Sequence, residues 1–233
     1  VSKSSNASLK SSIAAMMTLI LIFVFFAVLA ASWFMGLWSN LLTLVVLLLS
    51  GLIATNYFEP LAAYLDKPVV GGPPAISAMA TYTYLLDFIC FWSLFLVSLF
   101  GLRITTDILS RHRIRFNYWV EIVGRSVLSL WVAWIFVSIV AFSLQLSPLP
   151  AASVQATPSS RMMLIGPDRI WIGFMQSRSR GALARGRFSE TGRHEDDVDG
   201  NYEPFDSQAD LIYKYHTRRE QLENQKGALR VNR

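Results

Sequence analysis

The fold is decided by residues 13–58, which read IAAMMTLILIFVFFAVLAASWFMGLWSNLLTLVVLLLSGLIATNYF and carry no Asp, Glu, Lys or Arg. As a helix, residues 13–35 alone would extend roughly 35 Å, enough to cross a hydrocarbon core of about 30 Å. Residues 36–40 (GLWSN) form a short turn with a flexible glycine, and residues 41–58 form a second span that ends before Glu59 and Pro60. Two spans with so short a link predict an antiparallel helical hairpin.

Two further apolar stretches follow. A loop over residues 59–80 contains GGPP at 71–74, a run that cannot sustain a helix. Residues 81–104 then give a third span, and residues 120–146 a fourth that ends at Ser147-Pro148. The sequence therefore predicts an all-α membrane protein whose residues 13–147 form a domain of four transmembrane helices.

The polar N-terminal extension, residues 1–12 (VSKSSNASLKSS), leaves two alternatives open. The chain begins with Val rather than Met, and translation from Met16 would remove the extension together with Lys3 and Lys10. A cleaved signal peptide is the other alternative, because small residues near Ala30 resemble a cleavage site. The apolar stretch is long for a signal peptide and continues through Trp33, which favours a retained helix.

Charge divides the chain into two halves. Residues 1–147 carry 8 Lys/Arg and 5 Asp/Glu, whereas residues 148–233 carry 13 and 11. The second half is therefore a polar, Arg-rich C-terminal tail, which we expect to be largely disordered. Within it, residues 162–175 are apolar enough to dock on protein or lie at the membrane surface, and residues 209–226 favour a short exposed helix. Residues 176–200 read as disordered.

The net charge of +5 is spread along the chain rather than gathered on one stripe. This distribution argues against a nucleic-acid partner and favours attraction to anionic lipid headgroups. Counting Lys and Arg near the spans gives four on each side of the membrane, so the positive-inside rule does not decide the orientation. If translation begins at Met16, the count favours both termini outside and the basic loop at 105–119 in the cytoplasm.

Asp87 is the most informative single residue, because it lies about 9 Å into the third span by helical rise. An ionised carboxylate at that depth is costly unless it faces water, a partner or the bundle interior. It is therefore a candidate for proton or cation handling, or for a polar contact between helices. The simpler interpretation is a carboxylate that marks the entrance of the helix. Asn56 and Glu59 are the nearest candidates to face it across the bundle.

Charged residues also flank the loop between the third and fourth spans. Arg103 and Asp107 are four residues apart, as are Glu121 and Arg125, so each pair shares a helix face and can neutralise itself. Together they resemble a charged collar at one membrane surface, with an anchoring role favoured over chemistry. The loop between them contributes a basic cluster that we expect to contact lipid headgroups: Arg111, Arg113 and Arg115.

No motif in the sequence indicates an enzyme or a cofactor. The chain shows no phosphate-binding glycine loop, no nucleophile elbow and no zinc spacing, and its three histidines are scattered. The acidic run at residues 195–200 approximates the start of a calcium loop, but the usual glutamate at the twelfth position is Asp206. We expect no catalytic residue, no metal and no cofactor.

The arrangement of spans resembles the colicin V production protein (CvpA) family. The resemblance covers residues 17–146 and rests on the opening span, the tight turn at Gly36, the directly attached second span, and the short basic loop before the last span. The segment from Gly36 to Leu65 (GLWSNLLTLVVLLLSGLIATNYFEPLAAYL) has the look of the family, including the exit at Tyr57.

This resemblance implies a multi-pass protein of the bacterial inner membrane that supports the production or export of a peptide toxin, or envelope homeostasis. Its partners would be the lipid bilayer, further copies of the chain or other membrane proteins. Two alternatives stay open: a membrane-anchored binding or scaffold module that acts through the C-terminal tail, and a small component of an ion- or proton-conducting channel.

Overall fold

The computed structural model describes residues 2–66, 83–109, 117–149, 161–163, 165–179 and 209–231, together with positions 154, 159, 185–186, 202–203 and 205–206. Along the chain the elements are α1 (Ser2–Trp33), α2 (Leu37–Asp66), α3 (Thr83–Leu109), α4 (Tyr118–Leu146), α6 (Pro167–Ser179), β1 (Arg185–Gly186), β2 (Tyr202–Glu203) and α7 (Leu211–Val231). Apart from the two-residue antiparallel pairing of β1 with β2, the regular secondary structure of the described residues is helical.

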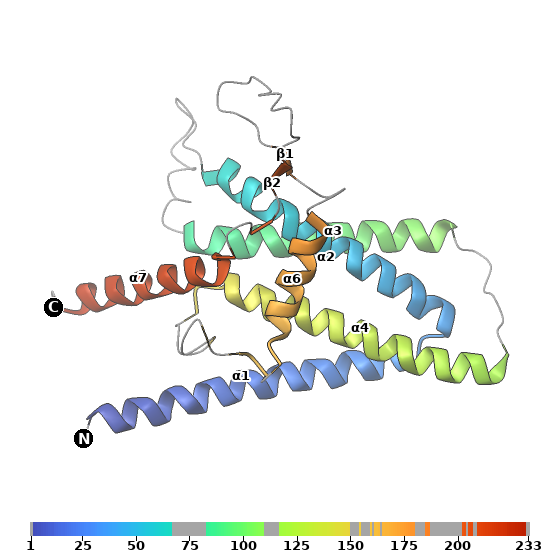
Figure 1. Ribbon diagram of the computed structural model, residues 1–233, viewed down its shortest axis with the longest axis horizontal. Helices are drawn as coiled ribbons and strands as arrows, with labels where there is room; N and C mark the ends of the chain where they lie inside the picture. The colour runs from blue at the N-terminus through green and yellow to red at the C-terminus, as the bar shows by residue number, and fades with distance from the viewer. Residues whose placement is uncertain are drawn as a thin grey trace.

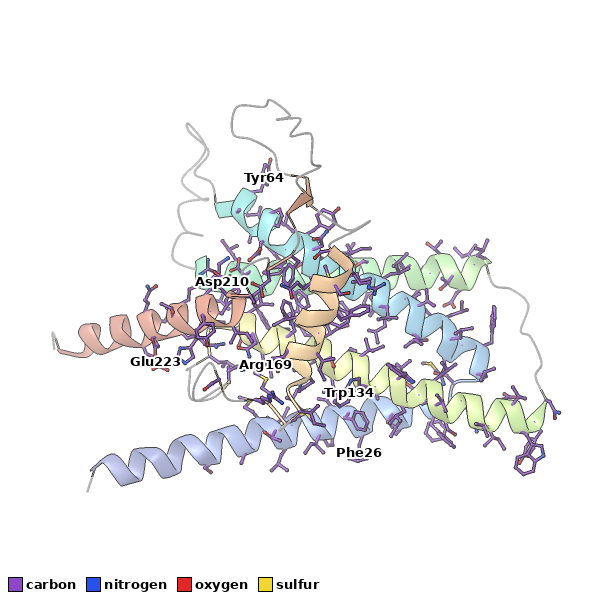
Figure 2. The ribbon with its side chains drawn as sticks, in the orientation of Figure 1. Phe26, Tyr64, Trp134, Arg169, Asp210 and Glu223 are labelled. Carbon is purple, nitrogen blue, oxygen red and sulfur yellow. The ribbon has the colours of Figure 1, made fainter. Side chains whose placement is uncertain are left out.

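The four predicted spans are confirmed as long apolar helices. The segments long and apolar enough to cross a membrane are Ala15–Trp33, Leu37–Leu65, Leu85–Leu109 and Tyr118–Leu146. Large apolar side chains on these helices remain exposed, as expected of surfaces that face lipid tails rather than water. Figure 2 shows Phe26, whose side chain is 60% exposed, on the outer side of α1.

The second span is longer than the sequence predicts. We expected it to end at residue 58, before Glu59 and Pro60, but α2 continues through Pro60 to Asp66. Proline removes one intrahelical hydrogen bond, a loss that membrane helices tolerate when neighbouring groups satisfy the freed carbonyl. Burial sustains the extra turns, since Leu61 and Ala62 pack against the core beyond the proline.

The short connection between α1 and α2 is present, but the two helices diverge from it (Figure 1). The hairpin we predicted is therefore open, because α1 packs against α4 rather than against α2, and α4 packs against both. The contact between α1 and α4 is a second buried cluster, in which Leu21 of α1 meets Val137 and Ala141 of α4. At Gly124, an added Cβ would lie 2.2 Å from Cδ1 of Leu37, so any larger residue there would require the Leu37 side chain to move.

An aromatic cluster holds α2, α3 and α4 together. Phe58 of α2 makes edge contacts with Phe91 of α3 and with Phe142 of α4, each at a centroid separation of 6.1 Å. Phe91 stacks on Phe95 one turn further along α3. All four rings are almost completely buried. Burying aromatic rings in this way supplies much of the packing that fixes the three helices.

The tail adds to this core instead of lying apart from it. In Figure 1, α6 runs across the long helices rather than along them, and it packs against α4 and α2. Its Trp171, Ile172 and Met175 belong to the same buried cluster as the aromatic rings of the bundle. An added Cβ on Gly51 would lie 2.7 Å from the indole of Trp171, so this glycine makes room for the ring.

The described part of the tail is therefore more ordered than the sequence predicts. The docking expected for residues 162–175 is present, and the helix expected over residues 209–226 is α7. That helix is not simply exposed, because its Leu211 and Tyr215 are buried in the core cluster. The apolar side chains that make this docking possible are few and widely spaced, so composition alone indicated disorder. Most of residues 180–200 lie outside the described part of the chain.

Candidate functional site

The tail reaches the bundle through a chain of contacts that begins at α6. Trp171 donates a hydrogen bond from Nε1 to Oγ1 of Thr55 on α2 at 3.0 Å. At the other end of α6, the hydroxyl of Ser179 accepts the backbone N–H of Phe205 at 2.8 Å, and the Gln176 side chain donates to the carbonyl of Asp206 at 2.9 Å. Phe205 is thereby placed against the aromatic cluster of the bundle.

Asp206 then starts α7. Its Oδ1 accepts the backbone N–H groups of Asp210, the residue before the helix, at 2.9 Å and of Leu211, its first residue, at 3.2 Å. N–H groups at the start of a helix have no partner within it. Burial raises the pKa of this carboxyl, and the two N–H donors partly oppose that rise. The position of α7 thus depends on the docking of α6.

Asp87 of α3 meets α7 directly. Its Oδ2 accepts a hydrogen bond from the Tyr215 hydroxyl at 2.8 Å and forms an ion pair with Nη1 of Arg218 at 2.5 Å. Beside it, Nζ of Lys214 lies 3.0 Å from Oε1 of Glu59 on α2. We call these five residues the tail–bundle seam. Burial, followed by the nearby charges of Asp87 and Glu59, raises the pKa of Tyr215 well above its ordinary value, so the phenol stays a donor.

A cavity of about 260 Å³ opens along this seam. It is lined by Glu59, Ala62 and Ala63 of α2, Leu86 and Asp87 of α3, and Lys214 and Arg218 of α7. Of the two candidates to face Asp87 across the bundle, Glu59 shares this cavity with it and Asn56 does not line it, and each carboxylate is paired with a cation from α7. The two carboxylates of the bundle and the two cations of α7 therefore attract each other, and this attraction weakens as the ionic strength rises.

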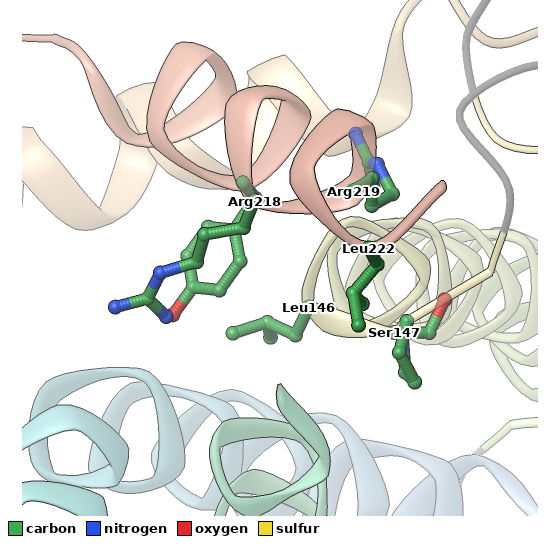
Figure 3. Close-up of a pocket in the computed structure, with 7 residues that line it drawn as sticks. Leu146, Ser147, Arg218, Arg219 and Leu222 are labelled. Atoms are coloured by element: carbon green, nitrogen blue, oxygen red, sulfur yellow. The ribbon is translucent and has the colours of Figure 1, made fainter. Parts of the chain in front are cut away.

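A second polar contact lies at the end of α4. Gln145, which is completely buried, donates from Nε2 to Oδ2 of Asp168 at 2.8 Å. Its backbone carbonyl and Oε1 accept hydrogen bonds from the two Nη groups of Arg219, at 3.0 and 3.2 Å. One amide thus connects α6 to α7, and we call this arrangement the buried bridge. Figure 3 shows Arg218 and Arg219 leaving α7 in different directions. Arg218 bonds to Asp87 in the seam, and Arg219 bonds to Gln145 in this bridge.

Burial dominates the electrostatics of the buried bridge. It raises the pKa of Asp168 despite the hydrogen bond from Gln145, and it lowers the pKa of Arg219 to about 10. A small cavity of about 10 Å³ lies between α7 and the end of α4, which is the space of roughly one water molecule. The bridge therefore holds α6, α7 and α4 together by hydrogen bonds in a site from which most water is excluded.

The opposite end of the bundle carries the charged collar. Arg103 forms the expected pair with Asp107, at 3.2 Å from Nε to Oδ2. Its guanidinium also donates to Oγ1 of Thr43 at 2.9 Å and to the hydroxyl of Ser39 at 3.1 Å, so it ties α3 to α2. Asn40 completes the polar contacts here, donating to the carbonyl of Ser32 at 2.9 Å and to the Ser129 hydroxyl at 3.1 Å.

The second predicted pair of the collar does not form. Within the described residues, Glu121 and Arg125 make no ion pair, and the guanidinium of Arg125 lies 5.1 Å from the ring centroid of Trp33 instead. Glu121 occupies the first turn of α4, where a carboxylate is stabilised by the helix dipole without a basic partner. The basic cluster of Arg111, Arg113 and Arg115 lies outside the described residues.

The sequence identified Asp87 but not the residues that meet it. Tyr215, Arg218, Arg219, Gln145 and Asp168 went unnoticed because each resembles an ordinary polar residue of a tail or a helix end. One signal was present: Lys214, Tyr215 and Arg218 share a face of the predicted helix at 209–226, and this basic face matched the two acidic residues at one end of the spans. No cluster of three metal-binding side chains occurs among the described residues, and the acidic run at 195–200 falls outside them.

These features define a multi-pass integral membrane protein with four transmembrane helices, whose C-terminal helices dock on the bundle through buried polar contacts. Comparison with protein-family models, with curated proteins and with solved structures finds no match to this chain. The function must therefore be argued from the site itself.

Proposed function

We propose that this chain is a non-enzymatic membrane scaffold that binds a partner protein through α7. The observation that carries the proposal is the way α7 is attached to the bundle. Its polar contacts with α2 and α3 are the ion pairs Arg218–Asp87 and Lys214–Glu59, together with the hydrogen bond from Tyr215. These ion pairs are partly exposed, so a competing protein can exchange them for its own contacts, while Leu211 and the bridge from Arg219 to Gln145 keep the start of α7 anchored in the core.

The other face of α7 remains free for a partner. Tyr213 is 59% exposed, and Glu220 lies on the exposed side as well. The helix continues to Val231 and projects past the end of α4 (Figure 1). A helix held by one face with an aromatic residue on the other suits the recognition of a groove in another protein.

The process that such a scaffold serves is the one the resemblance to the CvpA family predicts, namely toxin production or export, or envelope homeostasis in the bacterial inner membrane. A docked tail fits this role because α7 can recruit a partner protein to the membrane without a reaction being catalysed by the transmembrane helices. A proton or ion conduit has less support, since Asp87 is bonded to Arg218 and Tyr215 rather than to a polar path between the spans.

Site-specific photocrosslinking tests this proposal. A photoreactive residue at position 213, in the full chain and in its native membrane, is expected to give a crosslinked product with a second protein. The matched control is the same residue at position 26 on the outer side of α1, which is expected to contact lipid. If position 213 yields only products within the chain, or if both positions yield the same proteins, the assignment of α7 as the binding element is wrong.

A further inference from the structure

The connection between α1 and α2 brings an arginine to the level where the helices meet the membrane surface. The first span ends at Trp33 and the second begins at Leu37, which packs against Gly124 of α4. Arg125 follows directly, so its backbone lies beside that connection. This end of the bundle lies opposite the end where α7 docks (Figure 1).

Arg125 has no anionic partner among the described residues. Its guanidinium lies over the Trp33 ring at 5.1 Å, and its Nε is buried without a hydrogen-bond partner. A cation over an indole gains some stabilisation, but a buried donor without an acceptor carries a desolvation cost. Arg103 at the same end differs, because Asp107, Thr43 and Ser39 all bond to its guanidinium.

The surroundings indicate which anion would occupy the site. Exposed aromatic side chains gather at this end, including Trp33 at 40%, Phe34 at 85% and Trp119 at 71%. Tryptophan is enriched at the depth of the lipid headgroups, so these rings place Arg125 at the level of the phosphates. Toward the middle of α4, Val127 and Leu130 are exposed and suited to contact acyl chains.

We infer that Arg125 and Trp33 form a binding site for the phosphate of an anionic phospholipid. The planar guanidinium of arginine matches the geometry of phosphate oxygens, and the exposed part of the indole packs against the lipid beside it. The lipid would supply the anion that Glu121 does not supply. This site is discrete, in contrast to the general attraction expected of the loop cations Arg111, Arg113 and Arg115.

Native mass spectrometry of the full chain tests the inference, after purification in neutral detergent and incubation with phosphatidylglycerol or phosphatidylcholine. We expect the unmodified chain to retain one phosphatidylglycerol, and Arg125→Gln to weaken that retention by about tenfold or more. Arg125→Lys should bind with intermediate strength, because lysine keeps the charge but loses the planar fork. Trp33→Leu should weaken retention while leaving the cation in place.

The matched control is the triple variant Arg111→Gln, Arg113→Gln and Arg115→Gln, which should keep the discrete phosphatidylglycerol. Equal retention by Arg125→Gln and the unmodified chain would overturn the inference, and so would equal retention of phosphatidylcholine. Loss of the lipid on addition of inorganic phosphate would show that the site binds the free anion rather than a headgroup. If Arg125→Lys binds with intermediate strength, the weaker binding of Arg125→Gln does not result from misfolding, since the lysine variant has a side chain of similar length and the same charge.

Discussion

At the end of the bundle where α7 docks, Asp87 and Glu59 meet cations from a helix that lies 131 and 155 residues further along the chain. At the opposite end, Arg103 is satisfied by Asp107, one turn away, and by two hydroxyls of the neighbouring α2. Both ends place charges near a membrane surface. The tail end needs the whole chain to be folded before its carboxylates are neutralised, whereas the turn end needs only adjacent helices.

The difference has a consequence for stability. Ion pairs and buried polar groups at the tail end depend on α6, because α6 positions the start of α7 through Ser179 and Gln176. A change in α6 should therefore loosen the tail end and spare the turn end. Substitutions at the two ends test this asymmetry.

Trp171→Ala should have the largest effect. The indole is buried against Gly51 and donates to Thr55, so its removal leaves a cavity and takes away the hydrogen bond that the Thr55 hydroxyl accepts. Loss of a buried tryptophan costs about 3–5 kcal/mol of unfolding free energy. We expect hydrogen exchange in α7 to rise strongly, while the amides near Arg103 stay protected. Phe174→Ala is the matched control, because that ring lies on the same helix but is more exposed. Equal loss of protection at both ends of the bundle would contradict the asymmetry.

Gln145→Leu should have the next largest effect, by removing the buried bridge. Leucine is similar in size but offers no side-chain group to Asp168 or Arg219. Each buried polar group left without a partner costs about 1–3 kcal/mol, and charged groups cost more. Thermal unfolding in detergent should show the loss. Ser143→Ala, two residues nearer the middle of α4 and bonded within its own helix, serves as the control. A Gln145→Leu variant as stable as that control would show that the bridge contributes little.

The pH dependence of stability isolates Asp168. Burial raises its pKa in the folded chain, so the folded state binds this proton more tightly than the unfolded state does. The resulting stabilisation is complete below the ordinary carboxyl pKa and is lost as the pH rises through the folded value. The melting temperature of the unmodified chain, minus that of Asp168→Asn, should therefore fall as the pH rises from acidic to neutral. A difference that stays constant across this range would show that Asp168 does not titrate as its burial implies.

Most of the fold follows from the sequence, because transmembrane helices need only a long apolar stretch to be identified. The sequence also identified Asp87 as a candidate for a polar contact, because its carboxylate stands out among apolar residues. The open hairpin was not visible, since the preference of α1 for α4 depends on how Leu21 packs against Val137 and Ala141, and these apolar residues look like any others in a span. The residues that meet Asp87 were hidden for a related reason. The residues next to Arg218 in the sequence do not show whether its side chain pairs with Asp87 or faces water. The pairing depends on how the folded tail places α7 on the bundle.

The Asp87–Arg218 pair should have a moderate effect. Asp87 is largely buried, with 13% of its side chain exposed, whereas Arg218 is 41% exposed, so solvent screens the pair in part. A double-mutant cycle with Asp87→Asn and Arg218→Gln should give a coupling energy of about 1 kcal/mol in α7 exchange. The same cycle between Asp87→Asn and Lys214→Gln is the control, since Lys214 pairs with Glu59 instead. Equal coupling energies in both cycles would mean that Asp87 interacts with the cations of α7 in general rather than with Arg218 in particular.

The smallest effect is expected at Lys214–Glu59, where 41% and 28% of the side chains are exposed. A cycle with Lys214→Gln and Glu59→Gln should give about 0.2–1 kcal/mol at low salt, and that coupling should vanish near 1 M salt. The Asp87–Arg218 coupling should persist in part, because a buried carboxylate is screened less than an exposed one. Salt therefore separates the two contacts that hold α7. If both coupling energies disappear at the same salt concentration, Asp87 is screened like a surface charge. In that case the pair with Asp87 would hold α7 no more firmly than the pair with Glu59.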